Sequence, residues 1–285
     1  SSGKVAIYGQ ERNGQTQSLC RMNMFLHGFD DAKIEWGDTL SNPLFLDNGK
    51  LMKFQVIVLN PPFSLDKWAM GFAGAGDDKN FKMEASLDPH RRFEWGVPPK
   101  SKGDYAFIQH FLHSLAEGGR MGIVLPHGVL FRGAAEGRIR KQILDMNLLD
   151  AVIGLPANLF FGTGIPACVL LFKKNRTKKD VLFIDASGEG HYEKGTNQNI
   201  LRESDIKEIM DAYEKYEDIE KYAHVAKPEE IKENDFNLNI PRYVDTFEEE
   251  EPVDMDAVKE NITNIKKELV EVETKMEKYL GELGL

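Results

Sequence analysis

Apolar runs and amphipathic segments alternate along the first two-thirds of this chain, and that order predicts an α/β fold. Short runs rich in Val, Ile and Leu predict strands, whereas apolar residues three or four positions apart predict helices. Strands are predicted at residues 5–8, 33–38, 54–59, 121–125, 151–155, 167–172 and 181–185, and helices at 16–26, 104–117 and 134–145. The alternation early and the crowding of strands later are typical of an α/β sheet that ends in an antiparallel hairpin.

The last third of the chain has a different pattern. Residues 206–222 are predicted to be a charged helix, and residues 231–243 to be extended or irregular, because Pro241 excludes a helix interior. Residues 248–251 read as an acidic hinge. From Met255 to Leu283, apolar residues follow alternating steps of three and four, an a/d seam over four heptads. This predicts a long helix that packs against another helix, from a partner or a second copy. Packing on its own domain is the alternative.

Charge divides the chain in the same way. The first 180 residues hold 23 Lys and Arg against 18 Asp and Glu, and the remainder holds 13 against 28, so that the net charge is −10. The mildly basic front is compatible with nucleic-acid binding, whereas the acidic tail is not expected to lie on phosphates. The tail either meets a protein partner or stays solvated.

Composition also bears on the cellular compartment in which we expect the protein. The two cysteines, Cys20 and Cys168, lie in apolar sequence, which indicates a reducing compartment rather than a disulfide scaffold or a zinc site. No apolar run approaches the roughly 20 residues of a membrane span. The first residues do not form a signal peptide. We therefore expect a cytoplasmic protein with no metal site and no membrane association.

The most informative stretch is Asn60-Pro61-Pro62-Phe63, which follows the apolar strand 54–59. Two prolines cannot continue a hydrogen-bonded ladder, so they form a stiff corner at the carboxyl end of a strand, where α/β sheets bind ligands. The amide of Asn60 and nearby carbonyls can accept hydrogen bonds from an exocyclic amino group, and the Phe63 ring can stack on a heterocycle. An adenine flipped out of a nucleic acid fits both, and these four residues are the predicted catalytic set. The alternative is a plain Pro-Pro turn with Phe63 in the core.

Two acidic residues precede this corner, Glu11 after the first predicted strand and Asp38 after the second. In a domain that binds S-adenosylmethionine, acids in this order accept hydrogen bonds from the ribose hydroxyls and the adenine amino group. Glu11, Asp38 and Asn60 are therefore the predicted cofactor-binding residues. The glycine-rich loop for the methionine half should precede Glu11 by about twenty residues. Only ten residues precede it, so we expect the chain to begin partway through its domain.

About forty residues between Ser64 and Gly103 show no helix or strand period, which is uncommon unless a loop is functional or disordered. Basic side chains and aromatic rings are interleaved there, as in a loop that contacts nucleic acid. An ordinary Ω-loop is an equal alternative. The predicted nucleic-acid contacts are Arg91, Arg92, Lys100, Lys102 and, beyond this loop, Phe161, whose ring could cover the other face of a flipped base. A Phe-Phe pair such as 160–161 is more often part of a core.

Several motifs taken together resemble the modification subunit of type I restriction–modification systems, an adenine-N6 DNA methyltransferase. They are Tyr-Gly-Gln-Glu at 8–11, Met-Asn-Met at 22–24, Asn-Pro-Pro-Phe at 60–63, Gly-Val-Pro-Pro-Lys at 96–100, Asp-Tyr-Ala-Phe at 104–107, Leu-Pro at 125–126 and Asn-Ile-Pro-Arg-Tyr at 239–243. The resemblance runs from residue 5 to the tail. The N-terminal helical domain and glycine-rich strand of that family have no counterpart here, so methyl transfer by this segment alone is in question.

The resemblance implies a Rossmann-like, S-adenosylmethionine-dependent methyltransferase sheet at residues 1–190, a connecting region at 191–251 and a subunit-contact helix at 252–285. It implies transfer of the methyl group to N6 of an adenine stacked on Phe63 and hydrogen-bonded to Asn60 and the Pro61 carbonyl. The implied partners are DNA and the specificity and restriction subunits, with self-association through the C-terminal helix as a further option. Two other readings stay open: an RNA or protein-glutamine methyltransferase, and a non-catalytic assembly or DNA-clamping module.

Overall fold

The computed structural model describes residues 5–75, 81–246 and 255–283, which fall into two compact units, residues 1–246 and 247–285. The first unit contains every described strand, and the second contains one helix, α7 (Met255–Leu283). Within the described residues, no helix combines the length and the apolar composition that crossing a membrane requires.

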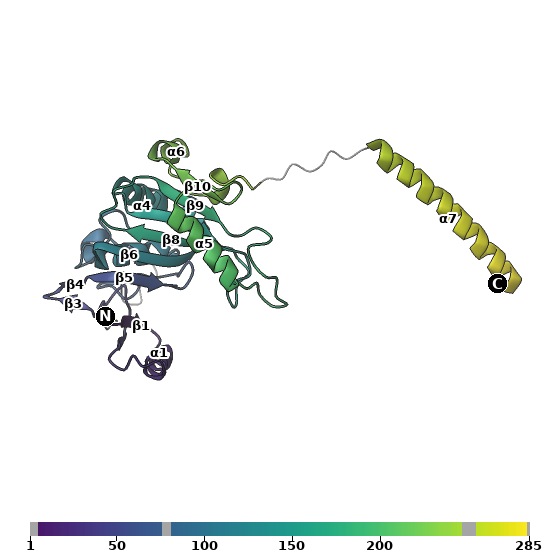
Figure 1. Cartoon of the computed structure of the whole chain (residues 1–285). Coiled ribbons are helices and arrows are strands. Elements are labelled where there is room, and N and C mark those ends of the chain that lie inside the picture. Colours follow the sequence, from purple (N-terminus) through teal and green to yellow (C-terminus); the bar gives the residue numbers. More distant parts are fainter. Residues whose placement is uncertain (1–4, 76–80, 247–254, 284–285) are drawn as a thin grey trace. The chain divides into compact units, whose positions relative to one another are not determined.

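Six strands form the main sheet, in the spatial order β10-β9-β7-β8-β6-β5 (Figure 1). They are β5 (Phe54–Leu59), β6 (Leu115–Pro126), β7 (Leu149–Gly154), β8 (Ala167–Lys173), β9 (Val181–Asp185) and β10 (Ala223–Ala226). Strands β5, β6, β7 and β9 run in one direction, whereas β8 and β10 run against their neighbours. The carboxyl ends of four strands therefore meet at one edge of the sheet.

Helices cover both faces of this sheet, which gives the α/β architecture predicted from the sequence. Helices α2 (Asp104–Ser114) and α4 (Ala134–Asp145) pack on one face, where Ile108, Ile139 and Ile123 of β6 share a buried core. Helix α5 (Glu203–Lys215) packs on the other face over β7 and β9 (Figure 1). Each fully buried Leu or Ile side chain in such a core contributes about 1.5–3 kcal/mol.

The N-terminal strands form a small parallel sheet of their own, β1 (Tyr8–Glu11) with β2 (Lys33–Trp36). They are joined by α1 (Gly14–Leu26), whose N-cap Asn13 accepts two backbone N–H bonds. A short hairpin, β3 (Leu46–Asp47) with β4 (Lys50–Leu51), follows. The ring of Tyr8 lies 5.3 Å from that of Phe54 at the start of β5, so aromatic packing joins the two sheets.

One edge of the main sheet is open within the described part of the chain. No described strand pairs with the outer edge of β5, and two of its side chains, Val56 and Val58, are 70% and 82% exposed. Parallel strands are ordinarily covered on both faces, so this exposure is unusual.

Element types agree with the sequence prediction for most of the chain, but several bounds differ. The first strand is Tyr8–Glu11 rather than 5–8, and α2 ends at Ser114 because β6 begins at Leu115, before the two glycines expected to end the helix. The predicted helix 206–222 is wrong beyond Lys215, where the chain turns to reach β10. Four short helices were not predicted: α3 (Gly128–Phe131), η1 (Ala85–Leu87), α6 (Pro228–Glu233) and η2 (Ile240–Arg242), of which the last two overlap residues 231–243, predicted to be extended or irregular.

The segment predicted as a connecting region contributes to the core of the first unit. Strand β10 extends the sheet, and Leu238, Ile240 and Tyr243 are buried against it around the short helix η2 (Ile240–Arg242). Tyr243 stacks on Phe183 with ring centroids 3.9 Å apart. The predicted acidic hinge at 248–251 lies outside the described residues.

The C-terminal helix is as predicted from its apolar period. Taken by itself, α7 carries a row of exposed apolar side chains. The described members of that row are Val258, Ile262, Ile265, Leu269, Val272, Met276 and Tyr279. Such a row is typical of a helix that meets another helix.

Candidate active site

The Asn60–Phe63 corner lies at the carboxyl edge of the main sheet, directly after β5. Asn60 and Pro62 are exposed, Pro61 is buried and Phe63 is half-buried. No hydrogen bond joins the Asn60 side chain to another residue in the part of the chain that the structure describes. Its carboxamide is therefore available to a ligand, on a backbone whose φ angles are fixed by the two prolines.

A second ring faces Phe63. The Phe160 ring lies edge-to-face with it, with centroids 6.0 Å apart and planes at 78°. Phe161, the residue predicted to reach the base, is 90% exposed. Within the predicted 160–161 pair, Phe160 rather than Phe161 contacts Phe63. Phe161 stays a predicted contact for nucleic acid.

Behind the corner lies a charged cluster that the sequence analysis missed. The carboxylate of Asp104 accepts the backbone N–H of Ser64 at 2.7 Å and its hydroxyl at 3.3 Å. Arg132 donates to Asp104 at 3.0 Å and to Glu136 at 3.0 and 3.2 Å. The sequence offered two signals, the i, i+4 spacing of Arg132 and Glu136 and the place of Asp104 in the Asp-Tyr-Ala-Phe motif, but neither joins Asp104 to Arg132.

This cluster is largely removed from water. The Asp104 and Glu136 side chains are 0% and 2% exposed. Burial raises the pKa of Glu136, although the positive charge of Arg132 opposes the shift. For Arg132 itself, burial acts to lower the pKa, but hydrogen bonds and charge from Asp104 and Glu136 outweigh it and raise the pKa. Arg132 therefore stays charged between two buried carboxyl groups.

The two predicted cofactor acids lie at the carboxyl ends of β1 and β2. Glu11 accepts the N–H of Asn13 with Oε1 at 2.7 Å. Asp38 accepts two backbone N–H bonds with Oδ1, at 2.9 and 3.0 Å, and its Oδ2 lies 3.4 Å from the Arg12 guanidinium. Each carboxylate thus uses one oxygen to shape its own turn, and the second oxygen of Asp38 already pairs with Arg12.

The turn after Asp38 packs against the loop that follows the corner. Leu40 is buried with Trp68 and Phe93, and its carbonyl accepts a hydrogen bond from Arg92 at 2.7 Å. Gly71 comes so close to this turn that an added Cβ would lie 2.2 Å from the Ser41 hydroxyl. The fold therefore brings the Asp38 turn and the 64–72 segment together, although 20 or more residues separate them.

These residues fit the adenosine half of S-adenosylmethionine. Oε2 of Glu11 can accept a hydrogen bond from a ribose hydroxyl, and the Asp38 turn can accept one from an amino group. For the methionine half, the described residues include no glycine-rich turn that leads from a strand directly into a helix. The described residues also contain no group of three or more His, Cys, Asp or Glu side chains that could hold a metal ion.

The 64–103 loop is partly a packed structure, and one predicted contact in it is wrong. Arg92 is fully buried, bound to both oxygens of Asp88 and to His110, so its guanidinium cannot reach a phosphate in this structure. Phe93 is buried beside it. Arg91 points outward, with a side chain 80% exposed and paired with Glu94.

The rest of the loop borders a hollow of about 510 Å³. Its wall includes Lys67, Lys82 and Lys100 around the apolar surface of Trp68 and Val97. Lys102 lies two residues further on and is half-buried. Lysines around an apolar floor suit a polyanion with flat bases, and contact of this loop with nucleic acid stays a prediction.

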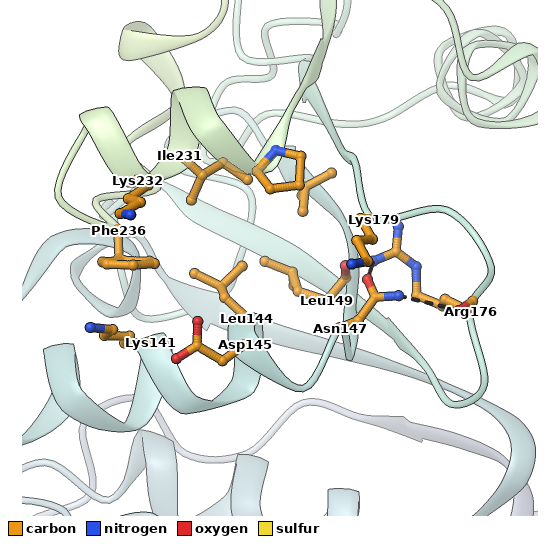
Figure 2. A pocket seen from close by; sticks show the side chains of 12 residues that line it. Lys141, Leu144, Asp145, Asn147, Leu149, Arg176, Lys179, Ile231, Lys232 and Phe236 are labelled. Carbon is orange, nitrogen blue, oxygen red and sulfur yellow. Dashed lines mark hydrogen bonds between the residues drawn. The ribbon is translucent and has the colours of Figure 1, made fainter.

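A second cavity, of about 430 Å³, lies at the opposite end of the sheet (Figure 2). It is lined by Leu149 and Val181, the first residues of β7 and β9, and by Ile231 and Phe236 from around α6. Because these are the amino ends of strands that run parallel to β5, this cavity is separate from the Asn60–Phe63 corner.

Comparisons with known proteins point to one family. The family described as N-6 DNA Methylase matches residues 1–252. The MjaVII methylase subunit of a type I restriction enzyme from Methanocaldococcus jannaschii is 36% identical over 282 residues, 95% of this chain and 46% of that protein. The corresponding MpnII subunit from Mycoplasma pneumoniae is 34% identical over 98% of this chain and 50% of its own length.

A solved structure agrees with these matches. The methyltransferase subunit of a type I restriction–modification system from Streptococcus thermophilus is 47% identical, with a TM-score of 0.73, over 85% of this chain and 49% of that one. This chain thus spans about half the length of the relatives it matches.

Proposed function

This chain belongs to the N-6 DNA methylase family, and from that premise we propose that it carries the methyl-transfer site of an adenine-N6 DNA methyltransferase in a type I restriction–modification system. The observation that carries the proposal is the Asn60–Phe63 corner. An amide without a hydrogen-bond partner among the described residues and a partly exposed ring lie on a proline-fixed backbone at the ligand-binding edge of an α/β sheet.

The geometry of the corner suits an adenine flipped out of the duplex. Its ring stacks on Phe63, and its N6 amino group donates one hydrogen bond to Oδ1 of Asn60 and one to the Pro61 carbonyl. Two acceptors on the same side draw the nitrogen out of conjugation with the ring, which frees its lone pair for attack. Catalysis then consists mainly of orientation and of acceptors aimed at developing positive charge.

S-adenosylmethionine, when bound, supplies an electrophilic methyl group on a sulfonium. Glu11 and Asp38 would hold its adenosine half, and the methyl group would pass to N6 with the electron pair of the broken sulfur–carbon bond left on sulfur. The alkylated nitrogen then loses a proton that Asn60 and Pro61 hold in a hydrogen bond until solvent takes it. No strong general base is needed, because N6 becomes acidic only after alkylation.

A methyl-transfer assay on the assembled complex tests this function. A labelled methyl group should appear at N6 of adenine in duplex DNA that contains the recognition sequence. Label in RNA, or in a protein glutamine, would instead favour one of the other methyltransferase readings. A complex that binds DNA but neither binds S-adenosylmethionine nor transfers methyl would favour the clamping module.

Glu11 and Asp38 are the proposed partners of the cofactor's adenosine half. Replacing Glu11 with Gln keeps an oxygen for the Asn13 N–H, so the cap of α1 survives, but removes the charge facing the ribose. A hydrogen bond to a charged group is worth about 1.5–3 kcal/mol, so S-adenosylmethionine should bind at least about 10-fold more weakly by calorimetry. Glu35→Ala, an exposed acid on β2, is the matched control and should bind normally. Unchanged affinity in Glu11→Gln would remove Glu11 from the cofactor site.

DNA and the other subunits of the system are the proposed partners. Lys67, Lys82 and Lys100 around the 510 Å³ hollow support contact with a polyanion, and Arg91 and Lys102 extend that surface. The apolar row along α7 supports contact with a helix of the specificity subunit, and self-association through the same row is the alternative.

Removing residues 252–285 tests the partner assignment. The six-stranded sheet lies wholly within residues 1–246, so the shortened protein should fold with an unchanged thermal midpoint. It should bind the specificity subunit at least about 30-fold more weakly, because a seam of several Leu, Ile and Val side chains contributes a few kcal/mol. Binding at full strength would assign the subunit contact to another surface. If, in addition, the truncated protein without its partner has a smaller oligomeric state than the full chain, the row on α7 serves self-association.

A further inference from the structure

The residue directly after the catalytic corner, Ser64, has an unfavourable backbone conformation that hydrogen bonds to another segment stabilise. Ser64 has φ of +51°, in the left-handed region that side chains other than glycine rarely adopt. The Asp104 carboxylate accepts its N–H and its hydroxyl. Gly103, one residue before Asp104, donates its N–H at 3.0 Å to the carbonyl of Leu65, one residue after Ser64. The start of α2 therefore clamps the backbone immediately after Phe63.

Arg132 ties this clamp to the neighbouring loop. It donates to Asp104, to Glu136 and, at 3.3 Å, to the Ser64 hydroxyl. Its guanidinium lies over Gly128, where an added Cβ would come within 2.4 Å of Nε. Gly128 follows β6, the strand next to β5, so the cluster joins the ends of adjacent strands at the ligand-binding edge.

We propose that Asp104 is a positioning residue for methyl transfer, which sets the direction of the Asn60 amide by fixing the backbone of Ser64. This inference rests on the function proposed above. Two prolines fix φ at positions 61 and 62, so little rotational freedom remains between Asn60 and Ser64. Restraint at Ser64 is therefore passed back to the amide.

The burial of Asp104 determines which kinetic constant it affects. Its side chain is 0% exposed, so it touches neither DNA nor cofactor. Removing it should leave both ligands bound but misdirect the groups that act on N6. Small misplacements of reacting groups cost rate rather than affinity. A role confined to stability would lower the amount of folded protein without changing kcat per folded molecule.

The variant Asp104→Asn tests the proposal in the assembled complex. The amide keeps an acceptor for the Ser64 N–H but loses the charge that holds Arg132. We expect kcat to fall about 10- to 30-fold, with KM for S-adenosylmethionine and Kd for DNA within about twofold of wild type. Amide hydrogen exchange at Ser64 and Leu65 should become faster.

Two further variants separate positioning from folding. Asp150→Asn makes the same change in another buried acid, one bound to Arg176 and Tyr213 at the amino end of the sheet, and should lower stability but not kcat. Gly128→Ala displaces the Arg132 guanidinium without altering a carboxylate and should lower kcat several-fold, as Asp104→Asn does.

A double variant identifies the route of the effect. If Asp104 acts through Asn60, adding Asp104→Asn to Asn60→Ala should change kcat by less than about twofold, because the group it positions is gone. The proposal would be overturned if the decrease in kcat of the double variant equalled the product of the decreases in the two single variants. A wild-type kcat in Asp104→Asn would also overturn it. An inactive wild-type complex would instead count against the proposed function itself, so the two failures are distinguishable.

Discussion

Replacing Asn60 with Ala should lower the rate of adenine methylation by 100-fold or more in the assembled complex. The amide is exposed and free of other hydrogen bonds among the described residues, so truncation removes an acceptor without disturbing the corner. Loss of one acceptor aimed at developing charge costs about 3 kcal/mol in the transition state. Single-turnover transfer of labelled methyl to duplex DNA measures the effect.

Three controls make the Asn60 result specific. The thermal midpoint should not change, because an exposed side chain is lost. DNA affinity should persist, because the proposed phosphate contacts lie in the basic loop rather than at the corner. Asn234→Ala removes an amide beside α6, at the opposite end of the sheet, and should leave the rate unchanged. Near-wild-type methylation in Asn60→Ala would refute the catalytic role of the corner.

Sequence pattern alone predicted most of the sheet, because the side chains that these elements bury form apolar or amphipathic runs in the sequence. Strands β5 and β9 and helix α4 have the predicted bounds, since each is a sharply bounded apolar or amphipathic run. Strand β10 escaped prediction because Ala-His-Val-Ala is short and follows charged residues, and it becomes a strand only by pairing with β9. The local alternation of apolar and polar residues cannot predict a strand that forms only by pairing with a strand distant in sequence.

In the candidate site too, features set by neighbouring residues were predictable, whereas contacts between residues distant in sequence were not. The Asn60–Phe63 corner was predictable, because two prolines after an apolar strand fix a local geometry. The Asp104–Ser64 bond spans 40 residues and the Arg132–Asp104 bond spans 28, and no spacing rule connects them. Arg92 was misassigned for a related reason: a basic residue in a basic loop gives no local sign that Asp88 and His110 enclose it.

The burial of Arg92 leads to the largest expected effect on stability. Arg92→Ala should lower the free energy of unfolding by about 3–5 kcal/mol, because removing one partner leaves a buried charge uncompensated. The partners left behind are the Asp88 carboxylate, with a side chain 0% exposed, and the Leu40 carbonyl. Urea unfolding at pH 7 measures the loss. Arg91→Ala, at the neighbouring exposed position, is the matched control and should cost less than about 1 kcal/mol.

The same pair predicts how stability varies with pH. Burial acts to raise the pKa of Asp88, but hydrogen bonds and charge from Arg92 prevail and hold it below 3.8. A lowered pKa contributes stability that is present above the unfolded value and lost as pH falls through the folded one. Without Arg92, burial alone should raise the Asp88 pKa, so protonation at low pH relieves the buried charge. The gap in unfolding free energy between wild type and Arg92→Ala should therefore narrow from pH 7 to pH 3. A gap that stays constant over this range would mean that the buried charge of Asp88 is not the source of the loss.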